Sequence, residues 1–252
     1  MFQGFYNLAS GMLTQNRNLN VVSNNMSNML TPGYKKDTML SSTFQEELMS
    51  RTGNLDRSNT TGLQDTSMFR SPTTNVTDFS QGAFEPTNQP LDFALENENG
   101  FFQIQTQNND VVYTRNGSFI IDDQGYLALA EKGRVIGTDG PIYLGTDDIQ
   151  LDETGMIHRK DGTAAGRFAI VDFADKTQLR KQDGSVFTAN ANANPIPSDT
   201  RVRQRILERS NVDAMVEMMD MLESQRTLQS ASQMMKMYDQ LMGKAATEIG
   251  RV

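Results

Sequence analysis

The chain has 252 residues, with 31 acidic and 23 basic side chains and a formal net charge of −8 at pH 7. An acidic chain lacks the concentrated basic surface that phosphate binding requires, so we expect no nucleic-acid partner. Cysteine is absent and there is a single histidine. This excludes disulfides and thiolate chemistry, and it leaves little for histidine-based catalysis. We expect no enzyme activity, no cofactor, no metal site and no small-molecule substrate.

The first stretch of the chain predicts a helix with one narrow apolar seam. Its apolar residues alternate at spacings of three and four, which is typical of helices that pack on other helices. Gln15 is the one polar member, and it is either a tolerated interruption or a residue that fixes the register between helices. The seam comprises Phe5, Leu8, Met12, Gln15, Leu19, Val22, Met26 and Met29.

A turn is expected to end this helix at Thr31. The residue before a proline disfavours helical geometry, and glycine permits a turn that other residues adopt only at a cost. We expect the tyrosine to anchor the turn by burying its ring. The turn motif is Thr31, Pro32, Gly33 and Tyr34.

Asn24, Asn25 and Asn28 near the end of this helix have two interpretations. Asparagine terminates helices and caps them locally, because its side chain competes for backbone hydrogen bonds. Alternatively, these side chains form ordered hydrogen bonds with neighbouring subunits.

The middle of the chain predicts β-structure after a connecting segment. Residues 35–50 fit a strand or a short helix. Residues 51–90 are rich in Ser, Thr, Asn, Gly and Asp and fit a linker or a loosely structured connecting domain. From residue 91 the apolar period becomes two, with Asn-Gly and Asp-x-x-Gly turns typical of antiparallel hairpins. Strands are expected at 91–95, 101–105, 111–115, 118–121, 126–130, 134–136, 142–144, 149–151, 156–159, 167–172 and 186–188, and a loop at 189–198. Residues 201–207 fit a return strand or a helical lead-in.

The last stretch predicts a second helix, capped by Ser210 and continuous to about residue 247. No glycine or proline interrupts it before Gly243. The apolar residues between Met215 and Leu222 are out of step with the later seam, so we expect a local phase change without a break. The seam comprises Leu228, Ala231, Met235, Tyr238, Met242, Ala245 and Ile249.

The expected fold is α+β, with terminal helices forming a coiled-coil-like domain and a central antiparallel β-rich domain. The two seams pack on each other or on copies of themselves. Residues 1–36 contain three bases and no acid, whereas residues 208–252 contain seven acids and five bases, so the charges of the two ends favour pairing. The expected divisions are residues 1–34 with 210–252 (helical assembly domain), 35–90 (connecting segment), 91–200 (β-rich domain) and 201–209 (return segment).

Several motifs resemble those of the flagellar rod proteins, a family of bacterial axial proteins. At the N-terminal end these are Leu8 to Met12, Ser23 to Asn28 and Thr31-Pro32-Gly33-Tyr34-Lys35-Lys36. In the middle, Tyr113-Thr114-Arg115-Asn116-Gly117-Ser118-Phe119 resembles the family's β-rich domain. Near the C-terminal end the matching segment is Leu207-Glu208-Arg209-Ser210-Asn211-Val212-Asp213.

The resemblance implies a structural subunit of the flagellar basal-body rod. Such a subunit polymerises through its terminal helices into the axial tube that transmits torque from motor to hook. Distal and proximal rod positions both stay open. Implied partners are the chain itself, other axial proteins of rod and hook, and the flagellar export apparatus. The resemblance also implies export with the N-terminus retained, which suits a sequence with no visible secretory signal peptide.

An assembly interface is expected along the two seams and at the end of the first helix. It comprises Leu8, Met12, Gln15, Leu19, Val22, Asn24, Asn25, Met26, Met29, Leu228, Met235, Tyr238, Met242 and Ile249. The alternative function is a soluble β-domain binding module that is merely dimerised by its terminal helices.

Overall fold

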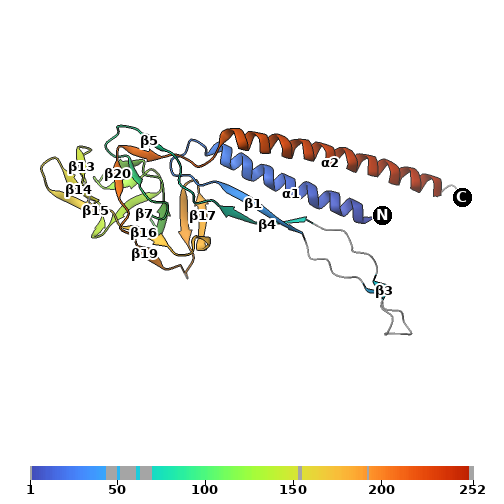
Figure 1. Cartoon of the computed structure of the whole chain (residues 1–252), viewed down its shortest axis with the longest axis horizontal. Coiled ribbons are helices and arrows are strands. Elements are labelled where there is room, and N and C mark those ends of the chain that lie inside the picture. Colours follow the sequence, from blue (N-terminus) through green and yellow to red (C-terminus); the bar gives the residue numbers. More distant parts are fainter. Residues whose placement is uncertain are drawn as a thin grey trace. The chain divides into compact units, whose positions relative to one another are not determined.

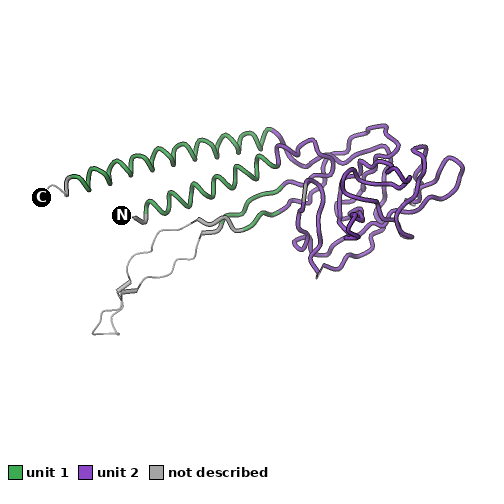
Figure 2. Tube along the Cα trace, turned by 180° about the vertical axis from the view of Figure 1, so that it is seen from behind, with its two compact units in different colours: residues 1–24, 37–76, 215–252 green, residues 25–36, 77–214 purple. Residues whose placement is uncertain are grey.

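The computed structural model describes residues 2–43, 50–51, 61–62, 70–152, 155–191 and 193–249. It confirms the expected α+β class, with a helix at each end and antiparallel strands between them (Figure 1). Residue contacts divide the chain into two units (Figure 2). The helical unit contains residues 1–24, 37–76 and 215–252, and the β unit contains residues 25–36 and 77–214. The domain boundaries expected from the sequence stay a prediction.

The helical unit is built on two long antiparallel helices, α1 (Phe2–Ser27) and α2 (Ala214–Ile249), which lie side by side (Figures 1 and 2). Asn18 on α1 donates a hydrogen bond from Nδ2 to Ser224 Oγ on α2, at 3.1 Å. Helix α2 runs unbroken for 36 residues, or about 54 Å at 1.5 Å per residue. Neither helix, over its described residues, has the apolar stretch that a membrane crossing requires.

Both expected helix boundaries next to the β unit are wrong, by four residues for α1 and by three residues for α2. Helix α1 ends at Ser27 rather than Thr31, and the chain continues in tight turns. Helix α2 begins at Ala214 rather than after Ser210. For α2 the physical reason is Asn211, whose Oδ1 accepts a hydrogen bond from Lys36 N–H at 2.7 Å and whose Nδ2 donates to Asp78 O at 2.9 Å. These contacts hold the chain outside the helix.

Two short antiparallel ladders follow α1. Strand β1 (Asp37–Thr43) pairs with β4 (Arg70–Thr77), and β2 (Ser50–Arg51) pairs with β3 (Thr61–Gly62). Of the two alternatives for residues 35–50, a strand or a short helix, the structure shows a strand at Asp37–Thr43. The expected linker contains β3, β4 and a further strand, β5 (Phe84–Pro86), and its residues 52–60 and 63–69 lie outside the described residues.

The β unit centres on a ten-stranded sheet whose main path runs β17-β18-β8-β7-β11-β10-β9. Strand β16 pairs with β7 and β19, and β12 pairs with β11. The strands are β7 (Phe101–Gln105), β8 (Val111–Thr114), β9 (Phe119–Ile121), β10 (Leu127–Leu129), β11 (Gly133–Gly137), β12 (Gly140–Pro141), β16 (Ile170–Phe173), β17 (Leu179–Asp183), β18 (Val186–Ala189) and β19 (Pro195–Pro197).

Smaller ladders complete the unit. They are β13 (Ile149–Leu151) with β14 (Met156–Arg159) and β15 (Ala164–Arg167), β20 (Val202–Gln204) with β6 (Phe93–Leu95), and β21 (Ile206–Glu208) with β5 (Phe84–Pro86). A 3₁₀ turn, Lys176–Gln178, precedes β17.

Most of the expected strands are confirmed, with two corrections. Residues 142–144 form no strand, and Tyr143 makes only an isolated bridge to Tyr126. The expected loop at 189–198 contains β19, whose prolines are tolerated because β19 pairs on one side only. The return segment contains two strands, β20, which pairs with β6, and β21, which pairs with β5, rather than a helical lead-in.

The core of the β unit forms two apolar clusters on opposite faces of β7. Phe102 and Ile104 belong to the larger cluster, whereas Phe101 belongs to the smaller one. Successive side chains of a strand point to opposite faces, so burial of both sets covers β7 on both sides. Edge-to-face packing adds to the larger cluster, with the Phe102 and Phe119 ring centroids 5.2 Å apart.

Candidate functional site

The two predicted seams face each other within one chain. Leu8, Met12, Gln15 and Leu19 on α1 are half-buried, and Val22 is buried. The seam residues of α2 are likewise less exposed than their neighbours, at Leu228, Met235, Tyr238 and Met242. A Cβ added to Gly4 would meet the Tyr238 hydroxyl at 3.8 Å, in ordinary van der Waals contact. Of the two packing possibilities, the structure shows the ends of the chain packed on each other.

The seam of α2 continues in step toward its N-terminus through polar residues. Glu217 and Ser224 are buried and Met221 is half-buried, at spacings of four and three. The less exposed residues of α2 therefore keep the same spacing along this stretch, and the expected phase change in the seam is wrong. The sequence pattern was misleading because most apolar residues of this stretch face away from α1, while Glu217 and Ser224 occupy the seam with Met221.

A large set of apolar side chains points outward from the helical unit. Met215 is 73 % exposed, Leu13 62 % and Leu222 49 %. Exposed apolar patches larger than a few hundred Å² are rare on soluble monomers and mark interaction sites. We call this set the outer face; it comprises Tyr6, Leu13, Met215, Val216, Met218, Met219, Leu222, Met237 and Leu241.

The remaining predicted interface residues lie in different environments. Asn24 is exposed, and Met26 and Met29 are half-buried. Asn25 is buried, and its Oδ1 accepts a hydrogen bond from Tyr34 Oη at 3.1 Å. The side chain of Ile249, the last residue of α2, lies outside the described part. Asn25 therefore acts within the chain, where it ties the end of α1 to the turn motif.

The turn motif lies against the end of β8. Gly33 has φ +67°, and a Cβ at this position would lie 2.4 Å from the backbone of Arg115. Its N–H donates to Glu208 O at 2.8 Å. The Tyr34 ring is fully buried, with Lys181 Nζ 3.5 Å above its centroid. Only glycine combines this backbone geometry with so close an approach.

Three buried charged residues meet beside this turn, and we call Lys35, Arg115 and Glu208 the charged cluster. Lys35 Nζ lies 2.5 Å from Glu208 Oε1 and donates a second hydrogen bond to Ser80 O at 2.7 Å. Arg115 Nη1 lies 3.3 Å from Glu208 Oε2. One carboxylate thus binds a cation from the N-terminal segment and another from the β-sheet.

The charged cluster holds two cations against one anion. Burial lowers the pKa of Lys35, and the adjacent Glu208 carboxylate offsets part of that effect. Burial also lowers the pKa of Arg115, again opposed by Glu208. Nε and Nη2 of Arg115 have no hydrogen-bond partner within the described part of the chain, although the guanidinium lies over the Phe101 ring at 5.3 Å. Glu208 is therefore the residue on which burial of both cations depends.

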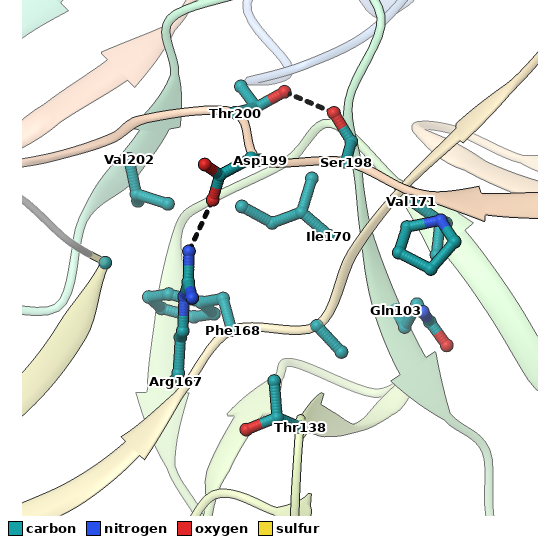
Figure 3. Close-up of a pocket in the computed structure, with 13 residues that line it drawn as sticks. Gln103, Thr138, Arg167, Phe168, Ile170, Val171, Ser198, Asp199, Thr200 and Val202 are labelled. Atoms are coloured by element: carbon teal, nitrogen blue, oxygen red, sulfur yellow. Dashed lines mark hydrogen bonds and ion pairs between the residues drawn. The ribbon is translucent and has the colours of Figure 1, made fainter.

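The β unit also carries a surface hollow of about 390 Å³ beside β15, β16 and β19 (Figure 3). Phe168 and Ile170 line it, and Arg167 Nη2 lies 2.5 Å from Asp199 Oδ1 at its rim. Asp199 is largely exposed, so this ion pair is solvated. Among the residues that line the hollow there is no histidine and no pair of carboxylates for acid–base chemistry.

Three family models match successive parts of the chain. The model "Flagella basal body rod protein" matches residues 5–35, "Flagellar hook protein FlgE/F/G D1 domain" matches 97–200, and "Flagellar basal body rod FlgEFG protein C-terminal" matches 203–248. A FlgG basal-body rod protein from Agrobacterium fabrum is 30 % identical over 259 residues, which covers 92 % of this chain and 94 % of that protein. The chain belongs to the flagellar basal-body rod proteins.

Two further relatives match this rod protein over nearly its whole length. A FlgF basal-body rod protein from Caulobacter vibrioides is 29 % identical, covering 96 % of both chains. The hook-basal body complex protein FlhO from Bacillus subtilis is 28 % identical, covering 100 % of both. The chain is thus a structural subunit of the flagellar axial family and not an enzyme. The alternative of a soluble binding module is not favoured.

The sequence motifs of this rod protein converge in the charged cluster. Lys35 follows the turn motif, Arg115 lies in the central motif, and Glu208 lies in the motif before α2. All three segments stand out as motifs in the sequence, but the sequence does not predict that they meet. Charged residues beside turns are normally exposed to solvent. The only sign in the sequence that these three matter is that each belongs to one of the motifs.

Proposed function

We propose that the helical unit carries the assembly contacts of this rod subunit. Its partners are further copies of the chain and other axial proteins of the rod and hook. The observation that carries the proposal is the outer face, whose apolar side chains are between 38 % and 73 % exposed in the single chain. Burying these side chains against neighbours stabilises an assembly by roughly 25 cal/mol for each Å² removed from water.

The predicted interface residues divide into two roles in this proposal. The seam residues act within the chain, since they hold α1 against α2; they are Leu8, Met12, Gln15, Leu19, Val22, Leu228, Met235, Tyr238 and Met242. Asn24, at the exposed end of α1, contacts a neighbouring subunit, as do the outer-face residues. A paired helix is a more rigid surface for such contacts than either helix alone, because single amphipathic helices are marginal in water.

The proposed assembly is a helical tube that transmits torque from motor to hook. Subunits joined head to tail through unlike surfaces generate an open helical array when the contact does not close into a ring. The β-rich region and the two ends of the chain serve as separate domains in this arrangement, with the boundaries expected from the sequence.

Delivery to the rod is proposed to occur through the flagellar export apparatus, with the N-terminus retained. The absence of cysteine suits a chain that passes unfolded through an export channel, because no thiol can oxidise on the way. No nucleic acid and no small-molecule substrate takes part.

Two substitutions on α2 test the assembly surface. Leu222→Asp places a charge on the outer face, whereas Gln225→Asp places the same charge at an exposed polar position three residues away. Each variant replaces the chromosomal copy, and swimming and rod length are recorded by motility assay and electron microscopy. We expect short rods and lost swimming for Leu222→Asp only. Complete rods in both variants would contradict the proposal.

A further inference from the structure

A groove runs between α1 and α2 inside the helical unit. It encloses about 310 Å³ and is largely apolar, lined by Leu8, Gly11, Met12, Leu228, Ala231 and Met234 among others. Small side chains create it. A Cβ built on Gly11 finds no atom within 4 Å, so the groove is open at this point.

A ridge of apolar side chains lies elsewhere on the same helical unit. Met215, Met218, Met219 and Leu222 belong to the outer face, and all four are about half exposed or more. Each helical residue advances about 100°. Around the helix axis, Met219 is therefore turned about 200° from the seam residue Met221, and Leu222 by the same angle from Ser224. The ridge points away from α1.

The ridge and the groove match in length and chemistry. Residues 215–222 and residues 8–15 each span about 10 Å along a helix at 1.5 Å per residue. Protruding side chains of one helix that insert between the side chains of others are the normal mode of helix packing. Because both partners are apolar, their contact removes water from both surfaces.

The charges beside the two surfaces are complementary. The stretch that carries the ridge, residues 214–225, contains Asp220 and Glu223 beside the buried Glu217, and no base. Helix α1, which forms one wall of the groove, contains Arg17 and no acid. Opposite charges steer an encounter and disfavour the pairing of like surfaces.

We propose that the ridge of one copy packs into the groove of a second copy of this chain. The inference rests on the proposed function of the helical unit and specifies which two surfaces meet. Ridge and groove are different patches, so the contact is heterologous and leaves a free ridge at one end and a free groove at the other. Repetition of this contact extends an axial array rather than closing a dimer.

Engineered cysteines test the contact directly, because the chain contains none of its own. The test pair is Gly11→Cys with Met219→Cys in one chain. The control pair is Gly11→Cys with Gln240→Cys, an exposed α2 position about 30 Å along the helix from Met219. Basal bodies are isolated from cells carrying each variant, oxidised, and separated on non-reducing gels.

We expect the test pair to lose its monomer band to a ladder of disulfide-linked multimers, and the control pair to remain monomeric. A test pair that stays monomeric in complete rods would overturn the inference, as would equal cross-linking of the control pair. Complete rods in either case leave the proposed function intact. If a cysteine variant does not enter the rod, a second substitution tests the same contact.

That second substitution fills the groove. Gly11→Leu places a side chain where the ridge is proposed to insert, and Gly243→Leu makes the same change at a helical glycine that also has open space around it. Leucine favours helix more than glycine does, so neither change weakens the helices. We expect loss of rod completion for Gly11→Leu alone. Normal rods with Gly11→Leu would overturn the inference.

Discussion

Lys35 and Glu208 are joined by a buried ion pair, with Nζ and Oε1 2.5 Å apart across 173 residues of sequence. The pair links the segment that follows α1 to the segment that precedes α2. Arg115 shares the same carboxylate from the end of β8. A single acid therefore connects three distant parts of the β unit.

Glu208→Gln is expected to destabilise the β unit severely. It leaves Lys35 and Arg115 buried without the carboxylate that both of them contact, a change that costs about 3–5 kcal/mol. The matched control is Glu85→Gln, which removes an exposed partner of Arg209 and is expected to cost no more than about 1 kcal/mol. Thermal unfolding of both variants measures the difference. Equal losses would show that Glu208 has no special role.

Lys35→Met is expected to cost less than Glu208→Gln. Its removal leaves one cation, Arg115, against one anion, Glu208, so the remaining charges balance. The methionine stem fills part of the space of the lysine, while the hydrogen bond to Ser80 O is lost. The comparison uses denaturant unfolding of the two variants side by side. A larger loss for Lys35→Met would contradict the shared-carboxylate account.

Gly33→Ala is expected to destabilise more than Gly162→Ala. Both glycines have positive φ, +67° and +76°, and alanine in that region costs about 1–2 kcal/mol. At Gly33 the added Cβ also meets the Arg115 backbone at 2.4 Å, whereas at Gly162 it meets nothing within 4 Å. The difference in unfolding temperature between the variants isolates the effect of close approach. Equal temperatures would mean that the turn can move away from β8.

Asp122 is expected to contribute stability that disappears in acid. Burial pushes its pKa upward, but hydrogen bonds from Tyr126 N–H at 2.8 Å and Arg134 Nε at 2.7 Å outweigh it and leave the pKa lowered. A carboxyl with a lowered pKa binds fewer protons when folded, so its contribution is complete above the ordinary pKa of about 3.9. It is lost as the pH falls through the folded pKa.

Asp122→Asn measures this contribution. The variant should unfold at a lower temperature than the native chain at neutral pH, and the gap should narrow in acid below the folded pKa of Asp122. Asp123→Asn, at the exposed next position of the same turn, serves as the control. A gap that stays constant with pH would rule out the assigned ionic role.

Leu19→Asp and Leu13→Asp separate the seam from the outer face. Leu19 is half-buried in the seam, whereas Leu13 is 62 % exposed on the same helix. Leu19→Asp should lower both helix content and rod assembly, because a buried charge separates α1 from α2. Leu13→Asp should lower assembly with helix content unchanged. Circular dichroism and motility give the two readouts, and identical behaviour would contradict the division of roles.

The sequence predicts much of this fold because its patterns are local. Spacings of three and four define both helices, and a period of two with Asn-Gly and Asp-x-x-Gly turns defines most strands of the β unit. The helix ends are less predictable. The start of α2 depends on the Asn211 side chain, which binds Lys36 and Asp78 more than 100 residues away.

The site residues are less visible because their environment depends on the tertiary fold. An apolar pattern cannot show that Glu217 and Ser224 occupy the seam while Met215 and Met219 lie outside it. Nor does a charged residue reveal that it is buried with a distant partner. Burial of the charged cluster requires three segments to meet, and no local pattern encodes that meeting.

Removal of the gene tests the central claim most directly, that this chain is a structural subunit of the rod. Basal bodies from the deletion strain are imaged by electron microscopy, and the intact gene is then restored. We predict that rods stop short and swimming is lost, and that both recover with the gene. Complete rods and normal swimming without the gene would contradict the account.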